Sequence, residues 1–187
     1  MIYTFDLRTV GFVVGIALVL VHLVGILNAK EMKGWLKAFP RSKPAGMILL
    51  VGAAAWAFWL VATMDLGEFY TMRGILMVVV PVACFLCMQY VDDFLSVRAL
   101  GMILLLLADP LLEAAFLRHE AGKLLLVVLA YAWIIIGMFW VGMPYLMRDQ
   151  IAWLLKSDSR WKAACIGGLA YGAAVIVCTL LFFQPQS

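Results

Sequence analysis

The most visible pattern in the chain is a series of long apolar runs separated by short linkers that carry charges, proline or glycine. Each run is close to the ~20 residues that a helix needs to cross a bilayer. Helices are expected because unpaired backbone amides are too costly in hydrocarbon. The pattern predicts an all-α polytopic bundle that forms a single integral membrane domain over residues 1–187. The six predicted spans cover approximately residues 9–27, 45–64, 74–91, 97–117, 124–146 and 163–183.

The linker at 28–44 has the periodicity of a helix that lies on the membrane surface. Its apolar residues follow the i, i+3, i+4, i+7 spacing, and its lysines fall on another face. Pro40 ends this pattern, so we expect a short cytoplasmic interfacial helix at 30–39. Fixing the tilt of the neighbouring spans is its favoured role, with docking of a lipid or a partner as the alternative. The predicted interface anchors are Lys30, Lys33, Trp35, Lys37 and, from a later linker, Trp153.

Composition agrees with this membrane assignment. Hydrophobic residues make up 66% of the 187 residues and charged residues 13%, whereas a soluble domain is about 45–50% apolar and about 25% charged. No nucleotide-binding glycine loop or paired CxxC pattern is present, and all four cysteines fall inside apolar runs. The sequence therefore requires no cofactor, predicts no disulfide framework and indicates no nucleic-acid partner.

The Lys and Arg residues are divided unequally between the two sides of the membrane. Linkers 28–44, 92–98 and 147–162 hold ten of them, and the opposite side holds Arg8, Arg73, Arg118 and Lys123. The positive-inside rule makes the first side cytoplasmic. We therefore predict a multi-pass protein of the cell inner membrane with both termini extracytoplasmic. The first run lacks a Lys/Arg-rich start and a small-residue cleavage site, so we expect a retained helix there.

Two acids interrupt the fourth apolar run. Asp109 lies near the midplane if Arg98 and Arg118 mark the ends of the span, which are about 30 Å apart along a helix. Glu113 lies one turn further out on the same face. An ionised acid at this depth costs several kcal/mol or so, hence both should face protein or water. Pro110 predicts a helix break, as two half-helices meeting at Asp109 or as one kinked helix.

His22 is the third ionisable residue within an apolar run. If the first and fourth spans touch, Glu113, Asp109 and His22 would form a ladder across the membrane, which suits a proton or ion path. The alternative is structural: the acids pair with Arg118, Arg73 or Tyr131, and His22 bonds a neighbouring helix. The structural alternative is favoured, because helix–helix contacts account for most such residues.

Soft side chains cluster in the third span, where Cys84 and Cys87 share a face and Met88 is nearby. Cys and Met suit Cu(I), but no further ligand is evident, so packing is the favoured interpretation. In the sixth span Gly167, Gly168 and Gly172 predict close helix packing.

Three function classes remain open from the sequence. The first is a small, non-enzymatic structural or assembly subunit of a larger membrane complex, in contact with the bilayer and with other subunits or copies of itself. The second is a proton- or cation-linked transporter or channel that uses the acids of the fourth span. An intramembrane redox protein stands third. The small size of the chain and the few Ser, Thr, Asn and Gln residues in its spans favour the first.

Overall fold

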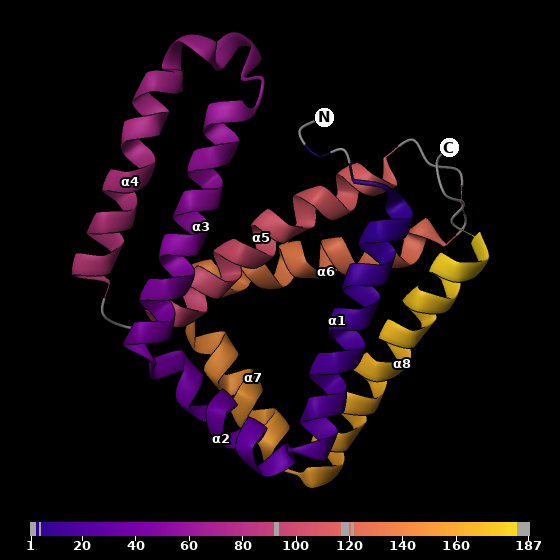
Figure 1. The fold of residues 1–187 in the computed structure, drawn as a ribbon. Helices are drawn as coiled ribbons and strands as arrows, with labels where there is room; N and C mark the ends of the chain where they lie inside the picture. Colours follow the sequence, from indigo (N-terminus) through magenta and orange to yellow (C-terminus); the bar gives the residue numbers. More distant parts are fainter. Residues whose placement is uncertain (1–2, 4, 92–93, 117–119, 121, 183–187) are drawn as a thin grey trace.

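Six long helices dominate the structure, a computed structural model that describes residues 3, 5–91, 94–116, 120 and 122–182 (Figure 1). Each of the six is long and apolar enough to cross a membrane. They are α1 (Leu7–Leu27), α3 (Lys43–Thr63), α4 (Arg73–Tyr90), α5 (Leu95–Ala115), α6 (Lys123–Gly142) and α8 (Asp158–Phe182). The predicted all-α bundle with six spans is therefore confirmed, and no strand occurs in the described part of the chain.

Shorter helices connect the spans. They are α2 (Ala29–Ala38), the 3-10 turn η1 (Phe39–Arg41), the 3-10 turn η2 (Gly67–Met72) and α7 (Tyr145–Leu155). The surface helix predicted at 30–39 agrees with α2 within one residue at each end. The pattern did not separate α7 from the fifth span, because apolar residues continue past the end of α6 at Gly142. We call the side of the molecule that holds α2 and α7 the α2–α7 end; α1 begins and α8 ends at the opposite end (Figure 1).

The spans are arranged as three packed pairs. Helix α1 packs on α8, α5 on α6, and α3 on α4, while α3 also packs on α5. Figure 1 shows the α3–α4 hairpin on one side of the molecule and the α1–α8 pair on the other, with α5 and α6 running between them.

Glycine permits the closest of these approaches. A Cβ atom at Gly101 of α5 would lie 2.8 Å from the carbonyl oxygen of Gly137 of α6, and the reverse distance is also 2.8 Å. Gly172 of α8 meets α1 in a similar way, with a Cβ atom 3.1 Å from the carbonyl oxygen of Gly15. The predicted role of the sixth-span glycines thus holds for Gly172, whereas Gly167 has open space around it.

Buried clusters hold the pairs together, and one of them, around Leu50, Cys84, Leu95 and Ala99, joins α3, α4 and α5. At the end opposite α2 and α7, side chains of α1, α5, α6 and α8 meet around Leu7, Leu111, Leu126 and Val175. At the α2–α7 end, Phe39 of η1 packs with Val97 of α5 and with Met147 and Ile151 of α7. The hydroxyl of the buried Ser96 donates a hydrogen bond to the carbonyl oxygen of Phe39 at 2.7 Å, which joins the start of α5 to η1.

Pro110 does not break α5. The helix runs without interruption from Leu95 to Ala115, and Pro110 is buried inside it. The predicted pair of half-helices meeting at Asp109 is therefore absent, and the fourth span is one helix. Because proline has no backbone N–H, the carbonyl oxygen of Leu106 loses its usual hydrogen-bond donor. The tightly packed neighbours of α5 stabilise the helix in spite of this loss.

Candidate functional site

The two acids predicted in the fourth span lie one turn apart on α5, next to the segment that precedes α1. Oε2 of Glu113 accepts a hydrogen bond from the backbone N–H of Tyr3 at 3.0 Å. Glu113 is half-buried, whereas Asp109, one turn nearer to the α2–α7 end, is exposed. The bond joins Tyr3 to a residue of α5 that lies 110 positions later in the chain.

The side chain of Tyr3 extends this contact from α5 to α3. Its hydroxyl oxygen accepts a hydrogen bond from Nε1 of Trp56 at 2.6 Å, and its ring centroid lies 5.7 Å from that of Trp59. Burial raises the pKa of the Tyr3 phenol; the bond from Trp56 lowers it, and the negative charges of Asp109 and Glu113 raise it further. The phenol is therefore within electrostatic reach of both acids. We call Tyr3, Asp109 and Glu113 the acid cluster.

Asp109 is the member of the acid cluster that has no polar partner in the described part of the chain. Within the described residues, its carboxylate makes no hydrogen bond and no ion pair. Of the partners expected from the sequence, Arg73 instead donates to the carbonyl oxygen of Met64 and lies over the ring of Tyr70. Tyr131 is exposed on α6, and Arg118 lies outside the described residues. The described residues thus supply no hydrogen-bond or ion-pair partner for this carboxylate.

His22 lies apart from the acid cluster. Its Nδ1 donates to the carbonyl oxygen of Leu18 at 2.7 Å, within the same helix, and its ring fills the space that a Cβ atom at Gly168 of α8 would need. The buried contact of α1 with α5 involves the first two turns of α1, around Leu7 and Val10. The structure therefore brings Asp109 and Glu113 together with Tyr3, while His22 faces α8.

The acid cluster can hold a proton or bind a cation. Two carboxylates one turn apart repel each other when both are charged, so a proton or a cation placed between them is stabilised. The Tyr3 hydroxyl accepts from Trp56 and keeps its own proton for donation. The described residues contain no group of three or more His, Cys, Asp or Glu side chains that could hold a metal ion.

Cys84 and Cys87 line an apolar cavity of about 350 Å³ between α3, α4 and α5. Both thiols are free, and Met88 packs against the same buried cluster as Cys84. The rest of the lining comes from Ala, Val, Leu and Met side chains. These surroundings suit packing, and they also leave room for an apolar molecule.

The predicted interface anchors have two different environments. Trp35 and Trp153 are exposed, and so are Lys30 and Lys37. Lys33 is different, because its ammonium group pairs with Asp158 of α8 and lies 5.5 Å from the centre of the Trp161 ring. Lys33 therefore contributes to an exposed contact between α2 and α8 of the same chain.

One group of side chains was missed by reasoning from the sequence. Lys37 and Arg41, from α2 and η1, line a cavity of about 450 Å³ together with Arg148 and Lys156, from α7 and its end. We call it the basic cavity. The sequence carries part of the signal, because the unequal distribution of Lys and Arg predicts all four cations on one side of the membrane. Nothing in the pattern indicated that two linkers more than 100 residues apart form one site.

Comparison of the chain with protein-family models, with curated proteins and with solved structures finds no match. The functional argument therefore depends on the chemistry of the acid cluster and of the basic cavity.

Proposed function

We propose that this protein is a small structural or assembly subunit of a larger membrane complex. The observation that carries the proposal is Asp109, an exposed carboxylate within a membrane-spanning helix and without a hydrogen-bond partner among the described residues. A charged acid in contact with lipid costs about 2.5–3.5 kcal/mol or more, so such groups are expected to face a partner or water. A neighbouring membrane helix that brings a cation or a polar donor would satisfy it.

The outer surface of α4 supports the same proposal. Helix α4 buries only Cys84 among its residues, and it packs mainly on α3, with Cys84 also reaching the buried cluster at the start of α5. Its remaining faces expose large apolar side chains such as Ile75, Val78 and Phe85. A further helix can pack there without displacing any part of this chain.

A proton- or cation-linked carrier or channel is the second candidate, and the acid cluster is the observation that favours it. Asp109, Glu113 and Tyr3 place three ionisable groups together at the end opposite α2 and α7. A path across the membrane would need further polar groups toward the α2–α7 end. His22, the residue predicted for this depth, packs on α8.

Substitutions at Asp109 distinguish the two candidates. In membranes of a host that makes the tagged protein, we expect the parent and Asp109→Asn to migrate in a complex larger than the 20.8 kDa protomer. Asn keeps the shape and the hydrogen-bonding capacity of Asp. Asp109→Leu should release the free protomer, because a buried partner left unsatisfied costs about 1–3 kcal/mol. The measurement is the mass of the protein–detergent particle by size exclusion with light scattering.

Glu113→Gln is the matched control, since it removes a charge one turn away while its amide oxygen still accepts from Tyr3. It should leave the complex intact. If the purified protein alone gives the larger mass, the partner is a second copy of the chain. Proton or cation flux in liposomes that Asp109→Asn abolishes would contradict the subunit proposal and support the carrier.

We further infer that the α2–α7 end faces the cytoplasm of a cell whose inner membrane holds the protein. The unequal distribution of Lys and Arg supports this orientation, with ten of fourteen in the linkers of that end. In single-cysteine variants, an impermeant maleimide added to intact cells should label Glu68→Cys in η2 and leave Lys30→Cys unlabelled. The opposite labelling would reverse the orientation.

A further inference from the structure

The basic cavity lies between two segments that are far apart in sequence. Lys37 and Arg41 come from α2 and η1, and Arg148 and Lys156 come from α7 and the residue that follows it. Its volume of about 450 Å³ is within the range of about 300–1,000 Å³ that small-molecule sites occupy. It can therefore hold a headgroup-sized ligand.

The charge of this cavity is largely uncompensated. Arg148 pairs with its neighbour Asp149, with an N–O distance of 2.9 Å. In the described part of the chain, Lys37, Arg41 and Lys156 make no ion pair. Asp92 and Asp93, which precede the lining residue Phe94 in sequence, lie outside the described residues. Three cations thus line one cavity, and no anion of the described residues pairs with them, which favours a negatively charged ligand.

A second cavity at the same end provides an internal comparison. It has a volume of about 500 Å³ and is lined by three lysines, but it also contains Asp158. The ammonium group of Lys33 pairs with that carboxylate. The protein therefore neutralises part of the charge of this second cavity and leaves the basic cavity open to an external anion.

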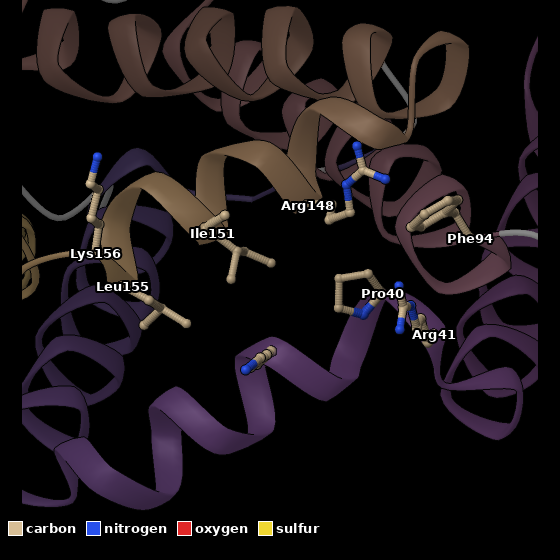
Figure 2. Close-up of a pocket in the computed structure, with 9 residues that line it drawn as sticks. Pro40, Arg41, Phe94, Arg148, Ile151, Leu155 and Lys156 are labelled. Atoms are coloured by element: carbon tan, nitrogen blue, oxygen red, sulfur yellow. The ribbon is translucent and has the colours of Figure 1, made fainter.

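The floor of the basic cavity is apolar. Figure 2 shows Ile151 and Leu155 projecting from α7 toward the segment that carries Pro40, with Arg148 and Lys156 near the two ends of the helix. The two cations are eight residues apart, or about 12 Å along a helix. The exposed Trp35 and Trp153 on α2 and α7 are typical of helices at the membrane interface. The ligand should therefore combine a charged group with an apolar part.

We propose that the basic cavity binds the phosphate group of an anionic phospholipid at the surface of the bilayer. Guanidinium groups match phosphate oxygens with paired hydrogen bonds, and lysines add compact positive charges. Basic pockets between helices on the cytoplasmic side are a recurrent way of holding lipid headgroups. The apolar floor favours a lipid over a soluble phosphate compound. This inference does not depend on the proposed role as a subunit.

Native mass spectrometry of the purified full-length protein tests the proposal by titration with phosphatidylglycerol. The double variant Arg41→Gln/Lys156→Gln removes two exposed, unpaired cations of the basic cavity. Lys30→Gln/Lys162→Gln removes two exposed cations of the second cavity and is the matched control. We expect the first variant to weaken binding of the tightest lipid by about tenfold or more and the second by about twofold or less. Phosphatidylcholine, with no net charge, should bind more weakly than phosphatidylglycerol to the parent.

Three results would overturn the proposal. Equal losses in the two double variants would indicate general attraction to the anionic surface, and unchanged binding in both would remove the site. Displacement of the lipid by inorganic phosphate at about millimolar concentration, together with phosphate binding in the absence of lipid, would identify a soluble anion as the ligand. A thermal unfolding curve for each variant, followed with a thiol-reactive dye, verifies that the protein is folded.

Discussion

Helices α4 and α5 are consecutive spans of similar length, and each contains an internal proline, yet their surroundings are opposite. Helix α5 buries ten residues and packs on α3 and α6, whereas α4 buries Cys84 alone and packs on α3. Pro81 of α4 is exposed, and Pro110 of α5 is buried. Both helices are apolar enough to span a membrane. Apolar character therefore identifies a span without indicating whether the span lies inside the bundle.

Residue size explains the difference between the two helices. The buried face of α5 includes Ser96, Ala99, Gly101 and Ala108, while α4 presents branched and aromatic side chains to the outside. Lipid tails are as apolar as leucine, so helices in a membrane gain little from covering large apolar side chains. They associate where small residues let their backbones approach closely. Helix α5 has such residues on the faces that meet α3 and α6.

Enlarging a glycine should produce the largest difference between the two helices. We expect Gly101→Leu in α5 to lower the free energy of unfolding by about 3 kcal/mol or more, because the side chain would meet the backbone of Gly137. Gly74→Leu in α4 should change it by about 1 kcal/mol or less, since no atom lies within 4 Å of a Cβ atom there. The measurement is SDS titration of the purified protein, followed through the reactivity of the buried Cys84 and Cys165.

Equal and large losses for the two glycine variants would mean that α4 is also packed against a partner in the purified state. This result would remove the distinction between a core helix and an outer helix. Equal and small losses would mean that α5 and α6 separate readily. The contact between Gly101 and Gly137 would then contribute little to stability.

Removing the buried hydrogen bond at the start of α5 should change the stability by an intermediate amount. Ser96→Ala should lower the free energy of unfolding by about 0.5–1.5 kcal/mol, because the carbonyl oxygen of Phe39 would lose one of its two donors and keep the backbone N–H of Ser42. Helix α4 contains no Ser or Thr. The control is therefore Thr63→Ala in α3, where an exposed hydroxyl donates to Trp59 of its own helix. It should change the stability by less than about 0.5 kcal/mol. The same titration measures both variants, and a larger loss for the control would contradict this assignment.

The sequence predicted the spans well because hydrophobic length is a local property. Span limits agree with the helices to within a few residues, except at the sixth span, where α8 begins at Asp158 and includes a charged first turn. The surface helix α2 was also predicted, since its apolar spacing is contained within ten residues. The separation of α6 from α7 was missed, because apolar side chains on both sides of Pro144 conceal the change in direction.

The sites were harder to predict, because they depend on which spans meet. The spacing of Asp109 and Glu113 placed them on one face of a helix, and the structure has them one turn apart on α5. Sequence position predicts a depth for His22 but not its direction around α1, and the structure places its ring against Gly168 of α8. The bond from Tyr3 to Glu113 is long-range and involves a backbone donor, so no side-chain pattern could indicate it.

The smallest expected difference concerns the two prolines. Pro81→Ala in α4 should raise the free energy of unfolding by up to about 1 kcal/mol, because the new N–H can bond the carbonyl oxygen of Met77 and no buried contact is lost. Pro110→Ala in α5 restores the equivalent bond to Leu106 but removes ring atoms from a buried position, so the two effects oppose each other. We therefore expect a change near zero or a small loss, measured by the same titration. A clear loss for Pro81→Ala together with a gain for Pro110→Ala would reverse the comparison, because the proline of the outer helix would then be the one that packing requires.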